Sequence, residues 1–337
     1  MKKRRTPFLM RTLSVLSKEL DFAYVFDKHK DEFGYIEFGD GSRHFVTRTD
    51  IRINSIGPYD IAKDKYHTDK FLKKFKYPVV PSELFYSEKF RAEFSFYEKG
   101  LEEAVIYAEK MSYPVITKPN NGLQGNDVCK VFNEKQLRRA LLKTFKKYEK
   151  VLVQKFAEGR DYRIIIYNGT FISAYRRNPL TIVGDGIHSI HQMIEKIQHQ
   201  AIKENRSVKF DYDSIKSVLA RKKMKITSIP EKNERIVLLD NANLSTGGYA
   251  EDVTNVIHSE YVKSAIAASN DLNFKLSGID LMVDGDITEA PKRRKWAFLE
   301  INASPGFDWY SRLGTEQHER IIDLFRRIIA DIKNKKI

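Results

Sequence analysis

GIDLMV at residues 278–283 and WAFLEIN at residues 296–302 read as two neighbouring β-strands with polar side chains set among apolar ones. Because alternate residues of a strand point to the same face, Glu300 and Asn302 project together. Asp280 lies on the first strand, so pairing of the two strands would gather three oxygen ligands of the kind that magnesium prefers. Alternatively, Asp280 and Glu300 are edge-strand acids with surface contacts only. The polar turn ASPG at residues 303–306 favours an open ligand site.

A lysine and a glycine-bearing loop follow another apolar strand, PVITKP at residues 114–119. Lys118 ends this strand, and Gly122 and Gly125 lie in the polar loop of residues 120–127. Glycines let backbone N–H groups approach phosphate oxygens, although no Gly-Lys-Ser/Thr follows as in a P-loop. The loop NLSTGG at residues 243–248, which begins at Asn243, could hold an anion in the same way. Either segment could equally be an ordinary surface loop.

Three arginines flank a predicted β-hairpin, whose strands at residues 163–167 and 170–175 are joined by the turn Asn168-Gly169. Arg163 begins the first strand, and Arg176 and Arg177 end the second. Since these ends of a tight hairpin lie side by side, several guanidinium groups could meet one anion, as phosphoryl transfer requires. The alternative is that they are unrelated surface arginines.

The rest of the chain predicts an α+β architecture. The first 60 residues read as short strands. Apolar residues recur with helical spacing at residues 64–75, 134–148, 187–200, 259–272 and 316–333. The hairpin-rich order favours α+β modules over a regular alternation of strands and helices.

The composition of the 337-residue chain limits the function classes. Its net charge of +14 is spread along the sequence, which fits a lysine-rich surface, a polyanion partner or a phosphate-bearing ligand. The sequence contains no run of about 18 apolar residues and no signal-peptide core, so we expect no membrane span. The single cysteine, Cys129, fits a reducing cytoplasm, and the histidine spacing does not suggest a zinc site.

Taken together, these segments resemble the ATP-grasp superfamily, most closely the ATP-grasp module of cyanophycin synthetases and fused glutathione synthetases. The matching segments are residues 115–119, 158–163, 179–186, 243–254, 278–280 and 300–306. Residues 64–81 also resemble the segment that leads into the lid of D-alanine ligases. The resemblance implies an α+β fold that holds the nucleotide between two antiparallel sheets, with a short β-rich N-terminal region. We expect a pre-grasp region at 1–75, a lid at 76–160 and a C-terminal metal-binding part at 161–337.

The resemblance also implies ATP and two Mg²⁺ ions as cofactors, with Mn²⁺ as a substitute for Mg²⁺. The metal ligands would be Asp280, Glu300 and Asn302. The nucleotide contacts would be Lys65, Lys118, the loop Gly122–Gly125, the adenine-facing hinge Gln154, Lys155 and Phe156, and Asn243. The γ-phosphate or acyl phosphate would meet Arg163, Arg176 and Arg177. Two departures from the family are the loop NGLQGN at residues 121–126, which lacks the usual Gly-x-x-Gly-Arg-Gly form, and the hinge, where acidic residues are commoner.

The implied function is a cytoplasmic Mg-ATP-dependent carboxylate–amine ligase that forms an acyl phosphate and releases ADP and phosphate. Its substrates would be small-molecule carboxylates and amines such as amino acids or small peptides. We expect neither a nucleic-acid nor a membrane partner, and a homo-oligomer is left open. The alternative is a catalytically silent nucleotide sensor or polyanion-binding protein. Carboxylates of the substrate other than the reacting one would be bound by His188, His191 and the basic residues 292–295, unless these basic residues form only a solvated hairpin tip.

Overall fold

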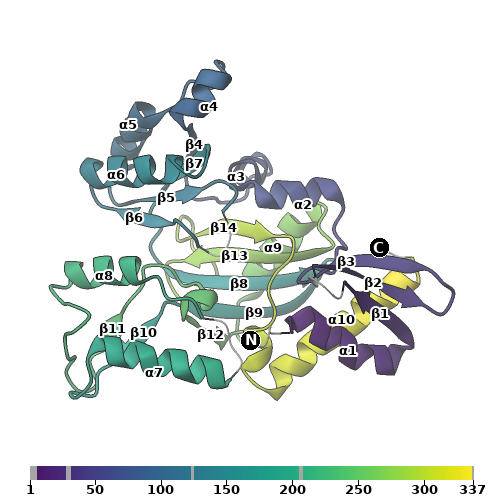
Figure 1. The fold of residues 1–337 in the computed structure, drawn as a ribbon. Coiled ribbons are helices and arrows are strands. Elements are labelled where there is room, and N and C mark those ends of the chain that lie inside the picture. Colours follow the sequence, from purple (N-terminus) through teal and green to yellow (C-terminus); the bar gives the residue numbers. More distant parts are fainter. Residues whose placement is uncertain (1–5, 28–31, 123–124, 205–207, 336–337) are drawn as a thin grey trace.

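The computed structural model describes residues 6–27, 32–122, 125–204 and 208–335. The chain builds a central five-stranded sheet, a four-stranded lid, a three-stranded N-terminal sheet and a helical insertion (Figure 1). This mixture of helices and antiparallel sheets confirms the α+β prediction. Within the described ranges, no helix is both long enough and apolar enough to cross a bilayer.

The central sheet is antiparallel throughout and has the strand order β12-β9-β8-β13-β14. Its strands are β8 (Arg160–Tyr167), β9 (Thr170–Asn178), β12 (Tyr249–Asp252), β13 (Leu276–Val283) and β14 (Trp296–Asn302). The predicted hairpin and the predicted pairing of β13 with β14 are both confirmed. Asn168 and Gly169 have φ values of 48° and 68°, the left-handed conformation that a two-residue turn of this kind needs at both positions.

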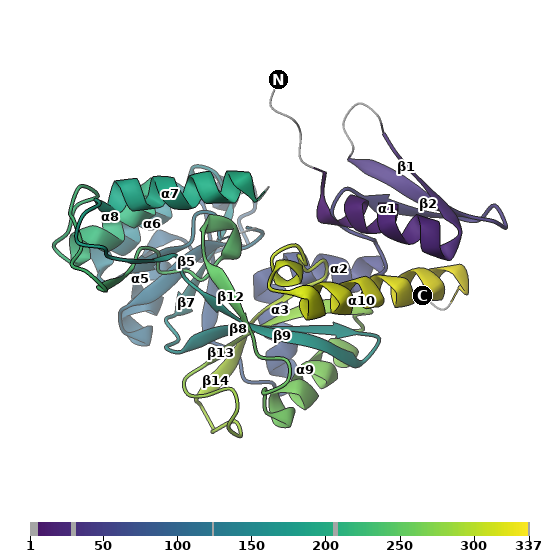
Figure 2. The same ribbon diagram turned by 90° about the horizontal axis from the view of Figure 1, so that it is seen from below.

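Two helices cover opposite faces of the central sheet, as Figure 2 shows. Helix α9 (Ser259–Asp271) packs on the face that contains Ile164 and Ile279. Helix α10 (Thr315–Lys333) packs on the other face, over Ile165 and Tyr167. Arg163 shares this second face by strand alternation, so the uncovered end of the face presents charged side chains.

The lid sheet has the order β4-β7-β5-β6, and its apolar residues pack against α5 and α6. The strands of this sheet are β4 (Ser82–Tyr86), β5 (Val115–Pro119), β6 (Cys129–Val131) and β7 (Lys150–Lys155). The helices of the same region are α4 (Glu88–Glu93), α5 (Leu101–Met111) and α6 (Glu134–Phe145). Two helices, α2 (Ile56–Lys63) and α3 (Lys65–Lys74), lead from the N-terminal unit into the lid.

The N-terminal unit begins with a helix, where only strands were expected. Helix α1 (Phe8–Leu20) precedes β1 (Phe22–Phe26), β2 (Phe33–Phe38) and β3 (Arg43–Thr47). The expectation of strands alone was wrong because Leu9, Leu13 and Leu16 recur at helical spacing and are buried together. These leucines join one core with α10, and the Phe8 and Phe325 rings lie 6.1 Å apart. Helices α1 and α10, which are far apart in the sequence, therefore share one core.

The helical insertion has its own apolar core between β9 and β12. It contains β10 (Thr181–Val183), α7 (Ile190–Lys203), α8 (Tyr212–Arg221) and β11 (Arg235–Val237), and is followed by the 3₁₀ turn η1 (Leu244–Thr246). A second 3₁₀ turn, η2 (Tyr310–Arg312), precedes α10. The lid and the insertion lie on one side of the central sheet and the N-terminal unit on the other (Figure 1).

Candidate active site

A cavity of about 1750 Å³ is lined by the lid, the central sheet, the insertion and the N-terminal unit. Pockets for one small ligand usually measure about 300–1,000 Å³, so this cavity has room for a nucleotide and a second substrate. Its lining includes fourteen lysines and arginines but only seven aspartates and glutamates. Such an excess of cations favours an anionic ligand. All fourteen site residues predicted from the sequence lie in this lining.

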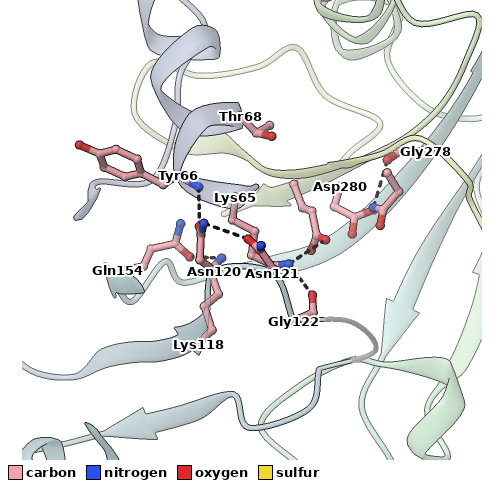
Figure 3. A network of polar contacts seen from close by, with 12 residues as sticks. Lys65, Tyr66, Thr68, Lys118, Asn120, Asn121, Gly122, Gln154, Gly278 and Asp280 are labelled. Atoms are coloured by element: carbon pink, nitrogen blue, oxygen red, sulfur yellow. Dashed lines mark hydrogen bonds and ion pairs between the residues drawn. The ribbon is translucent and has the colours of Figure 1, made fainter. Parts of the chain in front are cut away.

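Two buried lysines reach the cavity from different elements (Figure 3). Lys118 on β5 donates from Nζ to Gln154 Oε1 at 3.0 Å, and burial lowers the pKa of Lys118. Lys65, the first residue of α3, donates from Nζ to the Gly122 carbonyl at 2.6 Å and lies 3.4 Å from Glu300 Oε1. Glu300 lies close to Lys65, and the charges of Asp69 and Glu300 act on Lys118, so both ammonium groups lie beside carboxylates at the wall of the cavity.

Asn120 holds the two lysine-bearing segments together, which the sequence did not reveal. Its Oδ1 accepts from the backbone N–H of Tyr66 at 3.0 Å, and its carbonyl accepts from the N–H of Lys65 at 3.4 Å. Asn120 is fully buried directly after β5. Its position beside Lys118 was the available signal, since a buried amide needs several partners.

Asp69 is a second residue that the sequence did not single out. It lies four residues after Lys65 on α3 and accepts from Ser82 Oγ at 2.6 Å. Burial raises the pKa of Asp69 to about 6, and the positive charge of Lys118 opposes this effect. The i, i+4 spacing from Lys65 placed it on the same helix face and could have indicated it.

The three predicted metal ligands lie together at one wall of the cavity. Asp280 on β13 is directly opposite Glu300 on β14, and Asn302 is opposite Gly278. Gly278 permits this close packing, because a Cβ there would lie 2.7 Å from Cβ of Pro305. Among the described residues, no three His, Cys, Asp or Glu side chains converge, so a metal here would need the Asn302 amide as well as the two carboxylates. These hard oxygen donors fit Mg²⁺.

Two of the predicted arginines are anchored on Asp280. Arg163 donates to both carboxylate oxygens at 2.6 and 2.7 Å, and Arg177 donates to Oδ2 at 2.8 Å while also binding Asp161. Burial works against ionisation of Asp280, but the two guanidinium groups hold its pKa below the usual value. Among the described residues, Asp280 Oδ1 accepts a hydrogen bond from Arg163 alone, so this oxygen retains a lone pair for a cation.

Arg176 is placed differently from the other two arginines. It lies opposite Tyr162 and Glu251, whereas Arg177 lies opposite Asp161. Because neighbouring residues of a strand alternate between faces, Arg176 turns away from the Asp280 cluster, and its guanidinium lies 3.6 Å from the Glu251 carboxylate. Arg176 nevertheless lines the cavity.

The hinge and loop residues complete the lining. In the hinge, Gln154 is buried on β7, and Lys130 places its Nζ 3.4 Å from the centre of the Phe156 ring. Gly125 has a φ of 70°, and a Cβ there would lie 3.2 Å from Asn243 Nδ2. The lid loop thus meets the loop of residues 241–246. Residues 123–124 of the predicted Gly122–Gly125 loop lie outside the described residues.

The cations expected to read further substrate carboxylates are not part of the cavity lining. His188 pairs with Asp185 on the insertion, and the basic run 292–295 lies between β13 and β14. Neither segment lines the cavity, which favours the alternative that the basic run is a solvated hairpin tip. The N-terminal unit supplies Arg48, Asp50 and Arg52 instead. Their place in the cavity wall follows from long-range packing, which residue spacing does not reveal.

Asn54 attaches this N-terminal wall to the central sheet. Its Nδ2 donates to the carbonyls of Leu276 and Ala303, each at 2.7 Å. Its Oδ1 accepts from the N–H groups of Lys275 and Leu276 at 2.8 and 3.1 Å. Ala303 follows Asn302 directly, so this one amide fixes the N-terminal unit beside the candidate metal ligands.

Several known proteins are similar to this chain over part of its length. Residues 71–204 match the family model described as the C-terminus of D-ala D-ala ligase. The cyanophycin synthetase of Crocosphaera subtropica is 30% identical over 203 residues, which cover 58% of this chain and 23% of that protein. The glutathione biosynthesis bifunctional protein GshAB of Pasteurella multocida is 26% identical over 288 residues, 82% of this chain and 35% of its own length.

The crystal structure of a bifunctional glutathione synthetase from Pasteurella multocida superposes with a TM-score of 0.58 at 22% identity. The superposition covers 94% of this chain and 44% of the glutathione synthetase chain. The chain is thus similar to ATP-grasp ligases over part of its length and shares their fold. Its central and lid sheets are the two sheets of the ATP-grasp fold, with the cavity between them. The chain spans only about a quarter to a third of the length of these curated relatives.

Proposed function

We propose that this ATP-grasp protein is a Mg-ATP-dependent ligase that joins a carboxylate to an amine through an acyl phosphate. The contact of 3.4 Å between Lys65 Nζ and Glu300 Oε1 carries this proposal. It joins a cation suited to phosphate oxygens with a carboxylate suited to Mg²⁺, although the two residues lie on different parts of the chain. A metal-bound polyphosphate needs both kinds of group within a few ångströms.

Different residues of the chain would bind the phosphates, the adenine ring and the metal ion. Lys65 and Lys118 would bind phosphate oxygens, and the cavity end near Phe156 would take the adenine ring. Asp280, Glu300 and Asn302 would hold Mg²⁺, which when bound offsets negative charge on the phosphates. The relatives' names, which include a cyanophycin synthetase and a glutathione biosynthesis protein, support an assignment to bond-forming chemistry.

The proposed reaction has two displacements. A carboxylate oxygen of the substrate attacks the γ-phosphorus, the bond from that phosphorus to the β–γ bridging oxygen breaks, and ADP leaves. The amine nitrogen then attacks the carbonyl carbon, loses a proton, and phosphate departs. Arg163 and Arg177 are buried beside Asp280 and can stabilise negative charge on the transferred phosphoryl group. Arg176 would act from the rim.

A product screen tests the proposal. The purified chain is incubated with Mg-ATP, single amino acids or dipeptides, and hydroxylamine as a general amine, and the nucleotide and acyl products are identified by mass spectrometry. Carboxylate-dependent release of ADP with formation of a hydroxamate is expected. Release of AMP and pyrophosphate would refute the acyl-phosphate route.

A further inference from the structure

The N-terminal sheet has two unlike faces. Its inner face, with Ile36 and Phe38, packs into the core shared with α1 and α10. On the outer face, Val25, Tyr35 and Phe45 form one row across the three strands, because Val25 lies opposite Tyr35 and Tyr35 opposite Phe45. Val25 is 46% exposed and Phe45 69% exposed. Within the part of the chain that the structure describes, this row joins no apolar core.

This outer face leads into the cavity. The next row, at the start of β2, pairs Phe33 with Thr47, and both residues line the cavity. Phe33 is 66% exposed, so the apolar surface continues to the cavity mouth. Arg48 and Arg52 line the cavity just beyond it, and the Arg52 guanidinium stacks 4.6 Å from the centre of the Tyr59 ring. A ligand that lies along the outer face and extends into the cavity would therefore contact aromatic rings at one end and cationic side chains at the other.

The size of the face indicates what it can bind. Its strands have five or six residues, so they are about 17–20 Å long and about 4.8 Å apart. The outer face then measures roughly 250 Å², well below the roughly 800 Å² per partner of a stable protein interface. An extended segment of about five residues has the same length as the strands. The face fits a peptide better than a second copy of the chain.

We propose that the outer face of β1, β2 and β3 binds an extended peptide whose acidic side chain or carboxyl end is the carboxylate activated in the cavity. This inference rests on the proposed ligase function and narrows its carboxylate substrate from amino acids or small peptides to an acidic polypeptide segment. The row of Val25, Tyr35 and Phe45 would receive apolar side chains of the peptide. Arg48 and Arg52 would receive its carboxylates, because charge-assisted contacts select for acids.

The test selects binders from a display library of random 12-residue peptides on the full-length chain, without ATP. Recovered peptides should combine apolar residues with Asp or Glu. Their affinity, measured by fluorescence anisotropy of labelled copies, should fall at least about tenfold for Phe45→Ser. Because Phe45 is largely exposed, this variant should fold, which its thermal unfolding checks. Phe96→Ser is the matched control, since Phe96 is 72% exposed but belongs to the lid, and its peptide affinity should be unchanged.

Other outcomes would overturn the inference. Failure to enrich any peptide, or equal affinity for the wild type and Phe45→Ser, would exclude peptide binding on this face. If Phe45→Ser instead abolished a dimer seen by sedimentation and left peptide affinity unchanged, a second copy would be the occupant. Since the selection needs no turnover, it can succeed or fail independently of the hydroxamate assay that tests the ligase function.

Discussion

Replacing Asn54 should destabilise the whole C-terminal part of the molecule, although Asn54 belongs to the N-terminal segment. Its side chain makes four hydrogen bonds to backbone groups of Lys275, Leu276 and Ala303. Each such bond contributes about 1 kcal/mol net, and a buried group left without a partner costs more. We therefore expect Asn54→Ala to lower the free energy of unfolding by about 3–5 kcal/mol, a large part of the usual 5–15 kcal/mol.

Urea unfolding followed by tryptophan fluorescence measures this loss, since Trp296 begins β14 and Trp309 lies beside the N-terminal core. Asn255→Ala, in an exposed turn, is the control and should stay within about 0.5 kcal/mol of wild type. Asn54→Asp keeps the two acceptor contacts but sets a carboxylate against two carbonyl oxygens. The loss of unfolding free energy in Asn54→Asp, relative to wild type, should become smaller as the pH falls, because the protonated carboxyl group can donate a hydrogen bond. A loss below about 1 kcal/mol for Asn54→Ala would refute this reasoning.

Three further predictions concern the cavity. Glu300→Gln should lower kcat roughly a hundredfold or more in the ADP-release assay while circular dichroism stays native, and activity within a fewfold of wild type would show that the metal ligand is misassigned. Asp69→Asn should be more stable than wild type by at most about 3 kcal/mol near pH 8 and by almost nothing at pH 4, measured by urea unfolding. The sign follows because burial raises the pKa of Asp69 from 3.8 to about 6, so the native carboxyl keeps its proton where the unfolded chain has lost it, and stability falls as the pH rises through 6. An unchanged difference across this pH range would contradict the burial argument. Changing Arg293 and Arg294 together to Gln should leave every KM within about twofold, because neither residue lines the cavity, and a large rise in the substrate KM would contradict that placement.

The fold was largely predictable from the sequence because its strongest signals are local. The alternation around Asp280 and Glu300, the Asn168-Gly169 turn and the helical stripe of α10 each depend on residues a few positions apart. These patterns, with the ATP-grasp resemblance, predicted the paired strands and a set of site residues that lines one cavity. The helical spacing of Leu9, Leu13 and Leu16 is also a local signal and indicates α1, although only strands were expected in this region.

Contacts between distant segments were decided only by the tertiary structure. Alternation along β9 predicts that Arg176 and Arg177 face opposite ways, but only the strand register decided that Arg177 is the one beside Asp280. Packing of the N-terminal unit on α10 and the Asn54 bonds brought Arg48 and Arg52 to the cavity. Such contacts join residues as far apart as Phe8 and Phe325 and depend on how whole elements pack, whereas helical and strand periodicity is set within a single element.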